Sequence, residues 1–126
     1  MKHFARTYGP SLALAAGIAY LSLTTGSGLQ KMPTFENADK LVHFLMYACL
    51  AAALTFGLRQ DKKGLLLTIC TAIAAASAYG GLLELIQPYF PPRSCDLMDF
   101  IADFAGATAG SILTDIAWKT TNSSTR

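Results

Sequence analysis

Residues 93–110 read RSCDLMDFIADFAGATAG, an apolar segment rich in small residues whose beginning carries several charged groups. The charges are Arg93, Asp96, Asp99 and Asp103. An ionised side chain at the start of an apolar helix costs free energy unless another group pairs with it. The segment therefore predicts a helix whose charged end contacts other parts of the chain.

The acids and glycines of this segment share one face of the predicted helix. Asp96, Asp99, Asp103, Gly106 and Gly110 follow one another at steps of three, four, three and four residues, which is the helical repeat. The glycine pair forms a G-x-x-x-G pattern, which permits close approach of helix backbones in lipid. Because the glycines then face a neighbouring helix, we expect the acids to face the interior of the bundle.

Four long apolar blocks set the fold class. Hydrophobic residues make up 52% of the 126 residues, with a mean hydropathy of +0.38, and a membrane-crossing helix needs about 20 mostly apolar residues. The predicted fold is all-α, a four-helix transmembrane bundle in a single integral membrane domain covering residues 1–126. The expected spans are approximately 8–23, 41–58, 65–86 and 100–118.

The predicted spans differ in strength. The first contains Pro10 and Gly17, and the fourth is interrupted by Asp103 and Asp115. The alternative of a soluble four-helix bundle is disfavoured, because the second and third blocks offer no polar face to water. Cleavage of the first block as a signal peptide is also disfavoured, because no well-placed A-x-A site follows it.

The distribution of basic residues predicts the orientation. Seven of the ten Lys and Arg residues lie in the two termini or in the loop at 59–63, and the positive-inside rule therefore places both termini in the cytoplasm. The net charge of only +2 argues against nucleic acid as a partner, which requires a concentrated basic face.

Polar residues also recur at helical spacing near the outer end of the second and third spans. Asp39, His43 and Tyr47 are four residues apart in ADKLVHFLMY, so they share one face. Glu84 and Gln87 are three residues apart on the last turn of the third predicted helix, before prolines that end it. We therefore expect three helices to bring polar groups together at one depth.

These patterns resemble the VanZ-like family of small bacterial membrane proteins. The matching residues are Asp39-Lys40-x-x-His43-Phe44, Glu84-x-x-Gln87, and Arg93-x-x-Asp96-x-x-Asp99 followed by Gly106 and Gly110. Asp103 departs from the family pattern, which suggests Asn there. The resemblance implies a multi-pass protein of the bacterial inner or plasma membrane that is associated with reduced susceptibility to glycopeptide antibiotics such as teicoplanin.

The favoured hypothesis is a binding module for the head group of a lipid-linked cell-envelope precursor. The fork of donors on Arg93 suits a phosphate, and Lys40 adds charge. Membrane lipids and such a precursor are the expected partners, and neither the ligand nor the oligomeric state follows from the sequence. The candidate residues are Asp39, Lys40, His43, Tyr47, Glu84, Gln87, Arg93, Asp96, Asp99 and Asp103.

Other readings of the same residues stay open. Glu84, His43 and the aspartates could supply acid–base catalysis in a small intramembrane enzyme, although H-E-x-x-H and G-x-S-x-G motifs are absent. No cofactor is expected, but His43 with several carboxylates could hold a divalent metal that activates water. A proton or ion path has the least support, because Asp115 stands alone at the other end of the fourth helix. Finally, the polar groups could simply fix helix register.

Overall fold

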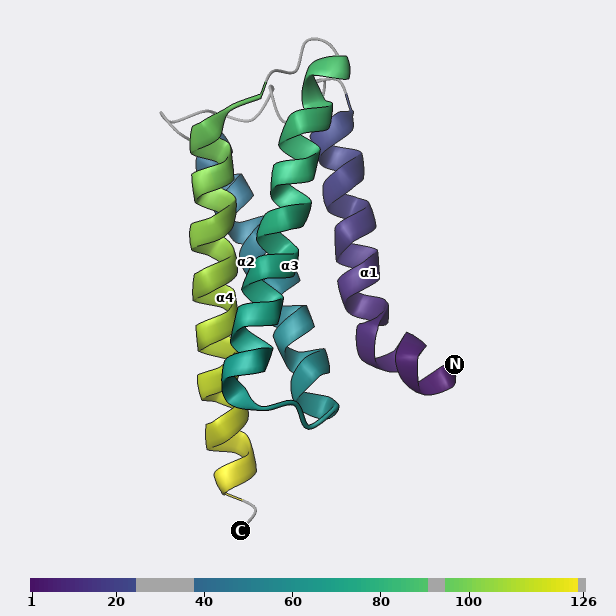
Figure 1. Ribbon diagram of the computed structural model, residues 1–126, viewed down its shortest axis with the longest axis vertical. Coiled ribbons are helices and arrows are strands. Elements are labelled where there is room, and N and C mark those ends of the chain that lie inside the picture. Colours follow the sequence, from purple (N-terminus) through teal and green to yellow (C-terminus); the bar gives the residue numbers. More distant parts are fainter. Residues whose placement is uncertain (25–37, 91–94, 125–126) are drawn as a thin grey trace.

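The computed structural model describes residues 1–24, 38–90 and 95–124. Within these ranges the chain contains four α-helices, one short 3-10 turn and no strand, so the predicted all-α class is confirmed (Figure 1). The elements are α1 (Lys2–Leu23), α2 (Ala38–Gln60), α3 (Leu65–Ile86), the turn η2 (Gln87–Tyr89) and α4 (Leu97–Ser123).

Three of the helices have the length and composition of membrane spans. Among the described residues these are α2, α3 together with η2, and α4, and only 33%, 28% and 33% of their most apolar windows are buried inside the protein. Large apolar side chains such as Leu66, Leu85 and Leu113 point outward. A water-soluble protein rarely exposes apolar surface this extensive, so these faces indicate contact with lipid.

Helix α1 is long enough to cross a membrane but falls short of the apolarity of the other three. It contains Pro10 and buries Thr7, Ser11 and Ser22. Figure 1 shows α1 bent in its N-terminal part. A bend is the expected result of an internal proline, which lacks the donor for one helical hydrogen bond.

The closest helix pair is α2 with α4, and its two glycines explain the approach. A Cβ atom added at Gly106 would overlap the backbone carbonyl of Phe44, and one added at Gly110 would overlap that of Ala48. Small residues at helix interfaces in lipid allow backbones to pack directly against each other. The predicted role of G-x-x-x-G in seating the fourth helix therefore matches the geometry of this pair.

The remaining core is small and lies between all four helices. Its buried apolar members are Ile18, Tyr47, Leu50, Ala51, Ala76, Leu83 and Ala107. The Tyr79 hydroxyl donates to the Ala15 carbonyl at 2.5 Å, which ties α3 to α1. Thr55 donates to Ser111 at 3.1 Å, which adds a buried polar contact between α2 and α4.

The two ends of the bundle carry different groups. In Figure 1 the beginning of α1, the end of α4 and the α2–α3 turn lie toward one end, here called the terminal end. The beginnings of α2 and α4 and the end of α3 lie toward the opposite end. The basic groups used to predict orientation are thus gathered at the terminal end, as far as the structure describes them.

Asp115 at the terminal end is not alone, and that prediction was wrong. Arg59 of α2 donates to it through both Nε, at 2.6 Å, and Nη2, and Lys119 lies 3.0 Å from its second oxygen. The partner on α2 was missed because 56 residues separate Arg59 from Asp115, and only the register between helices aligns them. Buried charges in membrane helices usually pair in this way.

A second polar contact at the terminal end fastens α1 to the α2–α3 turn. The Tyr8 hydroxyl donates to Asp61 at 2.6 Å, and a ring nitrogen of His3 lies 2.9 Å from the other carboxylate oxygen. Gly57 lies against the Tyr8 ring, where a Cβ atom would come within 2.9 Å of it. The Tyr8 hydrogen bond, followed by that of His3, lowers the pKa of Asp61 below its ordinary value.

Candidate functional site

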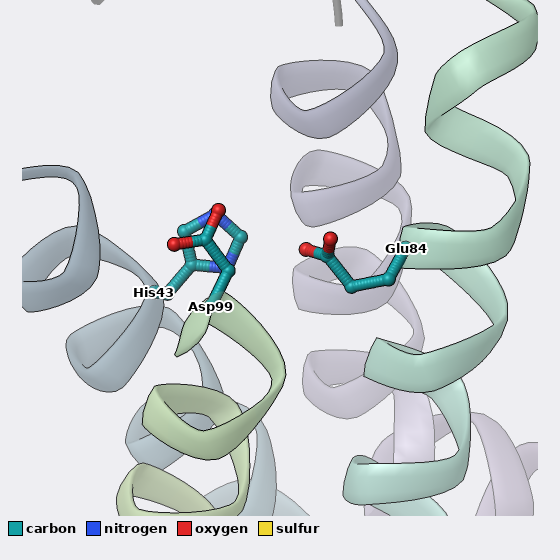
Figure 2. A group of neighbouring side chains, drawn as sticks. All are labelled: His43, Glu84 and Asp99. Carbon is teal, nitrogen blue, oxygen red and sulfur yellow. The ribbon is translucent and has the colours of Figure 1, made fainter. Parts of the chain in front are cut away.

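A group of polar side chains lies where α2 and α4 begin and α3 ends. Figure 2 shows His43 of α2, Asp99 of α4 and Glu84 of α3 directed toward a common space. One ligand atom from each of these residues lies within 4.8 Å of the other two. We name these side chains, at the end of the bundle opposite the terminal end, the outer polar cluster: Asp39, Lys40, His43, Glu84, Asp96, Asp99 and Asp103.

The innermost contact of the cluster joins α2 to α4. Nδ1 of His43 lies 2.8 Å from Oδ1 of Asp103, and Asp103 is fully buried. An ionised carboxylate can only accept a hydrogen bond, so we assign the Nδ1 proton to His43. The other ring nitrogen, Nε2, then faces Asp99, whose Oδ2 lies 3.6 Å away.

Two residues of the core shape the position of this pair. The Tyr47 ring stacks parallel to the His43 ring, with an interplanar angle of 6° and centroids 6.5 Å apart. Gly80 of α3 lies against Asp103, where a Cβ atom would come within 2.7 Å of Oδ2 and 3.0 Å of the Tyr47 ring. Gly80 was missed from the sequence, although the Gly-Gly pair inside an apolar helix is a signal of close packing.

Lys40 occupies the outer part of the cluster. Its Nζ lies 3.1 Å from Asp39, 3.3 Å from Asp96 and 3.4 Å from Asp99. The ammonium group therefore neutralises part of the acidic charge and links the first turn of α2 to the beginning of α4. Because three carboxylates surround it, Lys40 is not a free cation for an anionic ligand.

Asp96 has a local structural role that the spacing did not predict. Its side chain caps α4 by accepting from the Met98 N–H at 2.8 Å. Its own N–H donates to Oε2 of Glu84 at 3.0 Å, which joins the start of α4 to α3. The capping N–H and then Lys40 lower the pKa of Asp96 below its ordinary value. Asp directly before an apolar helix is a common capping signal and could have revealed this role.

The structure does not bring every predicted residue into the cluster. Gln87 belongs to η2 rather than to the last turn of α3, and its amide donates to the Ser22 carbonyl of α1 at 3.5 Å. Gln87 therefore contacts α1, and Ser22 was not anticipated. Asp39 lies in the first turn of α2 with most of its side chain exposed. The prediction for Arg93 lies outside the described residues.

The cluster is acidic in the part of the chain that the structure describes. Glu84, Asp99 and Asp103 are buried, with 3%, 9% and 0% of their surface exposed. Among the described residues, only Lys40 and, when protonated, His43 face them with positive charge. Such an arrangement suits ligands that donate hydrogen bonds or carry positive charge, and its described residues offer no open basic site.

Comparison with known proteins agrees with the sequence patterns. The family model described as VanZ/LLP1 matches residues 4–118, which is most of the chain. No curated protein and no solved structure matches this chain. The match covers α2 and α3 completely, most of α1 and α4, and every residue of the outer polar cluster. The chain therefore belongs to the VanZ-like family, and its apolar helices make it a membrane protein.

Proposed function

We propose that this protein binds the polar head group of a lipid-linked cell-envelope precursor at the outer polar cluster and thereby lowers susceptibility to glycopeptides such as teicoplanin. In this proposal residues 1–126 form one integral domain of the bacterial inner membrane. The domain crosses the bilayer four times, with both termini in the cytoplasm and the cluster at the outer leaflet. The gathering of basic groups at the terminal end supports this orientation.

The convergence of His43, Glu84 and Asp99 from three different helices is the observation that carries the proposal. Ionisable side chains within membrane helices are costly, about 2.5–3.5 kcal/mol at the helix centre and less toward the ends, and such groups usually mark a ligand or ion site. Three buried carboxylates beside one histidine support a role in recognition.

The chemistry of a precursor head group matches the acidic character of the cluster. Sugar hydroxyls and peptide N–H groups are donors, and Glu84 and Asp99 are acceptors. A phosphate needs cations, and Lys40 is already surrounded by three carboxylates. We therefore assign phosphate binding mainly to Arg93, whose guanidinium can form two parallel hydrogen bonds with it.

Direct binding tests this function. The purified chain in nanodiscs is titrated with lipid II and with undecaprenyl phosphate, beside Glu84→Gln, Arg93→Ala and the control Asp61→Asn. Asp61→Asn removes a carboxylate charge at the terminal end, far from the cluster. We expect saturable binding that Glu84→Gln and Arg93→Ala each weaken at least tenfold and the control leaves unchanged. Absence of binding to both lipids, or equal affinity in all four proteins, would contradict the proposal.

A susceptibility assay tests the biological consequence. A strain lacking the gene is complemented with the wild-type chain or with each of the same three variants, and growth is scored against teicoplanin. We expect restored tolerance with wild type and Asp61→Asn and no restoration with Glu84→Gln or Arg93→Ala. If the deletion strain and the strain complemented with wild type tolerate teicoplanin equally, the protein has no role in resistance, whether or not it binds lipid.

The contact between His43 and Asp103 favours a second candidate, an enzyme acting on a lipid or cell-wall precursor. A carboxylate that orients a histidine is a frequent arrangement in general acid–base catalysis, and Glu84 supplies a further proton acceptor nearby. Incubation of lipid-linked precursors with wild type and with the Glu84→Gln/Asp99→Asn double variant tests this candidate. Product formation that the double variant abolishes supports it, and absence of product from wild type contradicts it.

A further inference from the structure

His43, Glu84 and Asp99 form a donor set of mixed chemistry. They offer one imidazole nitrogen and two carboxylates from three helices, with the donor atoms all within 4.8 Å of one another. His43 and Glu84 are buried and the Asp99 side chain is only 12% exposed, so the three lie in a space of lowered dielectric. Nitrogen and oxygen donors in this combination are typical ligands of divalent first-row transition metals.

The orientation of the His43 ring indicates that a proton or a cation lies between His43 and Asp99. With the proton assigned to Nδ1 of His43, the lone pair of Nε2 points toward Oδ2 of Asp99 at 3.6 Å. Two lone pairs facing each other repel unless a proton or a cation lies between them. A carboxylate that holds the second ring nitrogen is also the usual support for a metal-binding histidine, because it fixes the tautomer and ring orientation.

The charge balance independently points to a cation. Three carboxylates of the cluster are buried within the spans, and among the described residues Lys40 is the only permanent positive charge that faces them. Lys40 contacts Asp99 from the outside, whereas Oδ2 of the fully buried Asp103 has no hydrogen-bond partner in the described residues. A divalent ion would balance this charge where water cannot screen it.

The donor separations lie near those of a metal site for His43 and Asp99 and within 4.8 Å for Glu84. Metal–ligand distances of about 2.0–2.2 Å place the donors of a tetrahedral site about 3.3–3.6 Å apart. The separation of 3.6 Å between His43 and Asp99 is already close to this value. Glu84 accepts the Asp96 N–H with Oε2 and can offer its other oxygen, so the anchor on α4 is compatible with ligation.

A competing donor set exists but is already occupied. Asp39, Asp96 and Asp99 also bring three carboxylate oxygens within 4.8 Å of one another. Lys40 Nζ contacts all three carboxylates, and Asp96 is also engaged as the cap of α4. A metal there would have to displace the ammonium group, so the set that contains His43 is the better site.

We propose that His43 Nε2, Glu84 and Asp99 bind one divalent transition-metal ion, with Zn²⁺ preferred and Mn²⁺ accepted, and that Asp103 positions His43 for this role. Three protein ligands leave one coordination position for water or for an oxygen of a bound phosphate. The proposal does not require lipid-linked precursors and stands apart from the proposed function.

Metal binding by the intact chain is the test. The protein is stripped with a chelator in nanodiscs that contain no envelope precursor and is then titrated with Zn²⁺, Mn²⁺, Mg²⁺ and Ca²⁺, with bound metal counted by mass spectrometry. We expect one Zn²⁺ per chain, weaker Mn²⁺ binding, and Mg²⁺ and Ca²⁺ at least a hundredfold weaker. No saturable Zn²⁺ binding would overturn the proposal, whatever the result of lipid titration.

Variants distinguish the two donor sets and the role of Asp103. We expect at least a hundredfold loss of affinity in His43→Ala, Glu84→Gln and Asp99→Asn, and a loss of about 10–100-fold in Asp103→Asn. Asp39→Asn and Asp61→Asn are matched controls and should bind like wild type. Wild-type affinity in His43→Ala, or loss in Asp39→Asn without loss in His43→Ala, would overturn the assignment.

A measurement on the wild-type protein removes any dependence on how the variants fold. X-ray absorption of the Zn²⁺-loaded chain should show only nitrogen and oxygen donors, including one imidazole. Sulfur in the coordination shell would assign the metal to a cysteine and overturn the proposal, as would a shell without imidazole.

Discussion

Nδ1 of His43 lies 2.8 Å from Oδ1 of Asp103, a contact that joins two residues 60 positions apart and fastens α2 to α4 inside the apolar region. Gly106 and Gly110 make the contact possible, because their missing side chains let the two backbones approach. The pair thus connects the packing of the bundle to the chemistry of the outer polar cluster. Both side chains are buried, so replacing either one removes the hydrogen-bond partner of the other.

Two replacements of Asp103 should distinguish the contribution of its charge to stability from that of its hydrogen bond with His43. The amide oxygen of Asp103→Asn can still accept from His43, whereas Asp103→Ala leaves a buried donor without a partner, which costs about 1–3 kcal/mol. We therefore expect Asp103→Ala to unfold at a clearly lower temperature than Asp103→Asn. Thermal unfolding of both purified variants measures this difference, and equal melting temperatures would show that the hydrogen bond contributes little.

Enlarging the glycines of α4 should separate it from α2. Gly106→Ala and Gly110→Ala would each place a methyl group into the backbone of α2, for which we expect a loss of about 1–3 kcal/mol, as in overpacked cores. Gly17→Ala in α1 is the matched control, since nothing lies within 4 Å of its added Cβ atom. Chemical unfolding in detergent measures the free energy of unfolding of the three variants. A control as damaging as the α4 variants would argue against the close approach.

The contact between Arg59 and Asp115 should behave as a coupled pair. Removing Asp115 leaves the largely buried Arg59 without its partner, which typically costs about 3–5 kcal/mol, whereas removing Arg59 leaves Asp115 in contact with Lys119 and should cost less. We expect Arg59→Ala and Asp115→Ala each to be destabilising, and the double variant to be much less destabilised than the sum of the two. A double-mutant cycle of unfolding free energies measures the coupling. Additive effects would contradict the pairing.

The pH dependence of stability should reveal the contact of Tyr8 with Asp61. The Tyr8 hydrogen bond lowers the pKa of Asp61 in the folded chain, so the carboxylate stabilises the fold above its unfolded pKa of about 3.9. This contribution is lost as the pH falls through the lower, folded pKa. Wild type should therefore melt above Asp61→Asn at pH 6, and the two should converge in strong acid. A constant difference across this range would contradict the assignment.

The features predicted correctly from the sequence depend on residues within a single helix. The helical spacing of Asp99, Asp103, Gly106 and Gly110 is a property of one segment, and it placed these residues on the face of α4 that meets α2. The apolar blocks likewise predicted the all-α class, because burial in lipid imposes composition on each helix separately. The weak first block corresponds to α1, which lacks the apolarity of the other helices.

The features that escaped prediction depend on how helices are aligned with one another. Arg59 meets Asp115, and Gln87 turns toward Ser22, because of rotations and offsets between helices that no single segment encodes. Lys40 was expected to supply charge for a phosphate, yet three carboxylates surround it. Its partners lie on α4 as well as on α2, so only the assembled bundle reveals that its charge is already engaged.

Thiol cross-linking tests most directly whether α2, α3 and α4 converge on one polar site. In a chain with Cys49, Cys70 and Cys95 replaced by Ser, the pairs His43→Cys/Asp99→Cys and Glu84→Cys/Asp99→Cys are treated in membranes with a short bifunctional thiol reagent. Asp61→Cys/Asp99→Cys, whose positions lie at opposite ends of the bundle, is the control. We predict efficient intramolecular cross-linking of the first two pairs and none of the control. Failure of both cluster pairs to cross-link would contradict the convergence on which the proposed site depends.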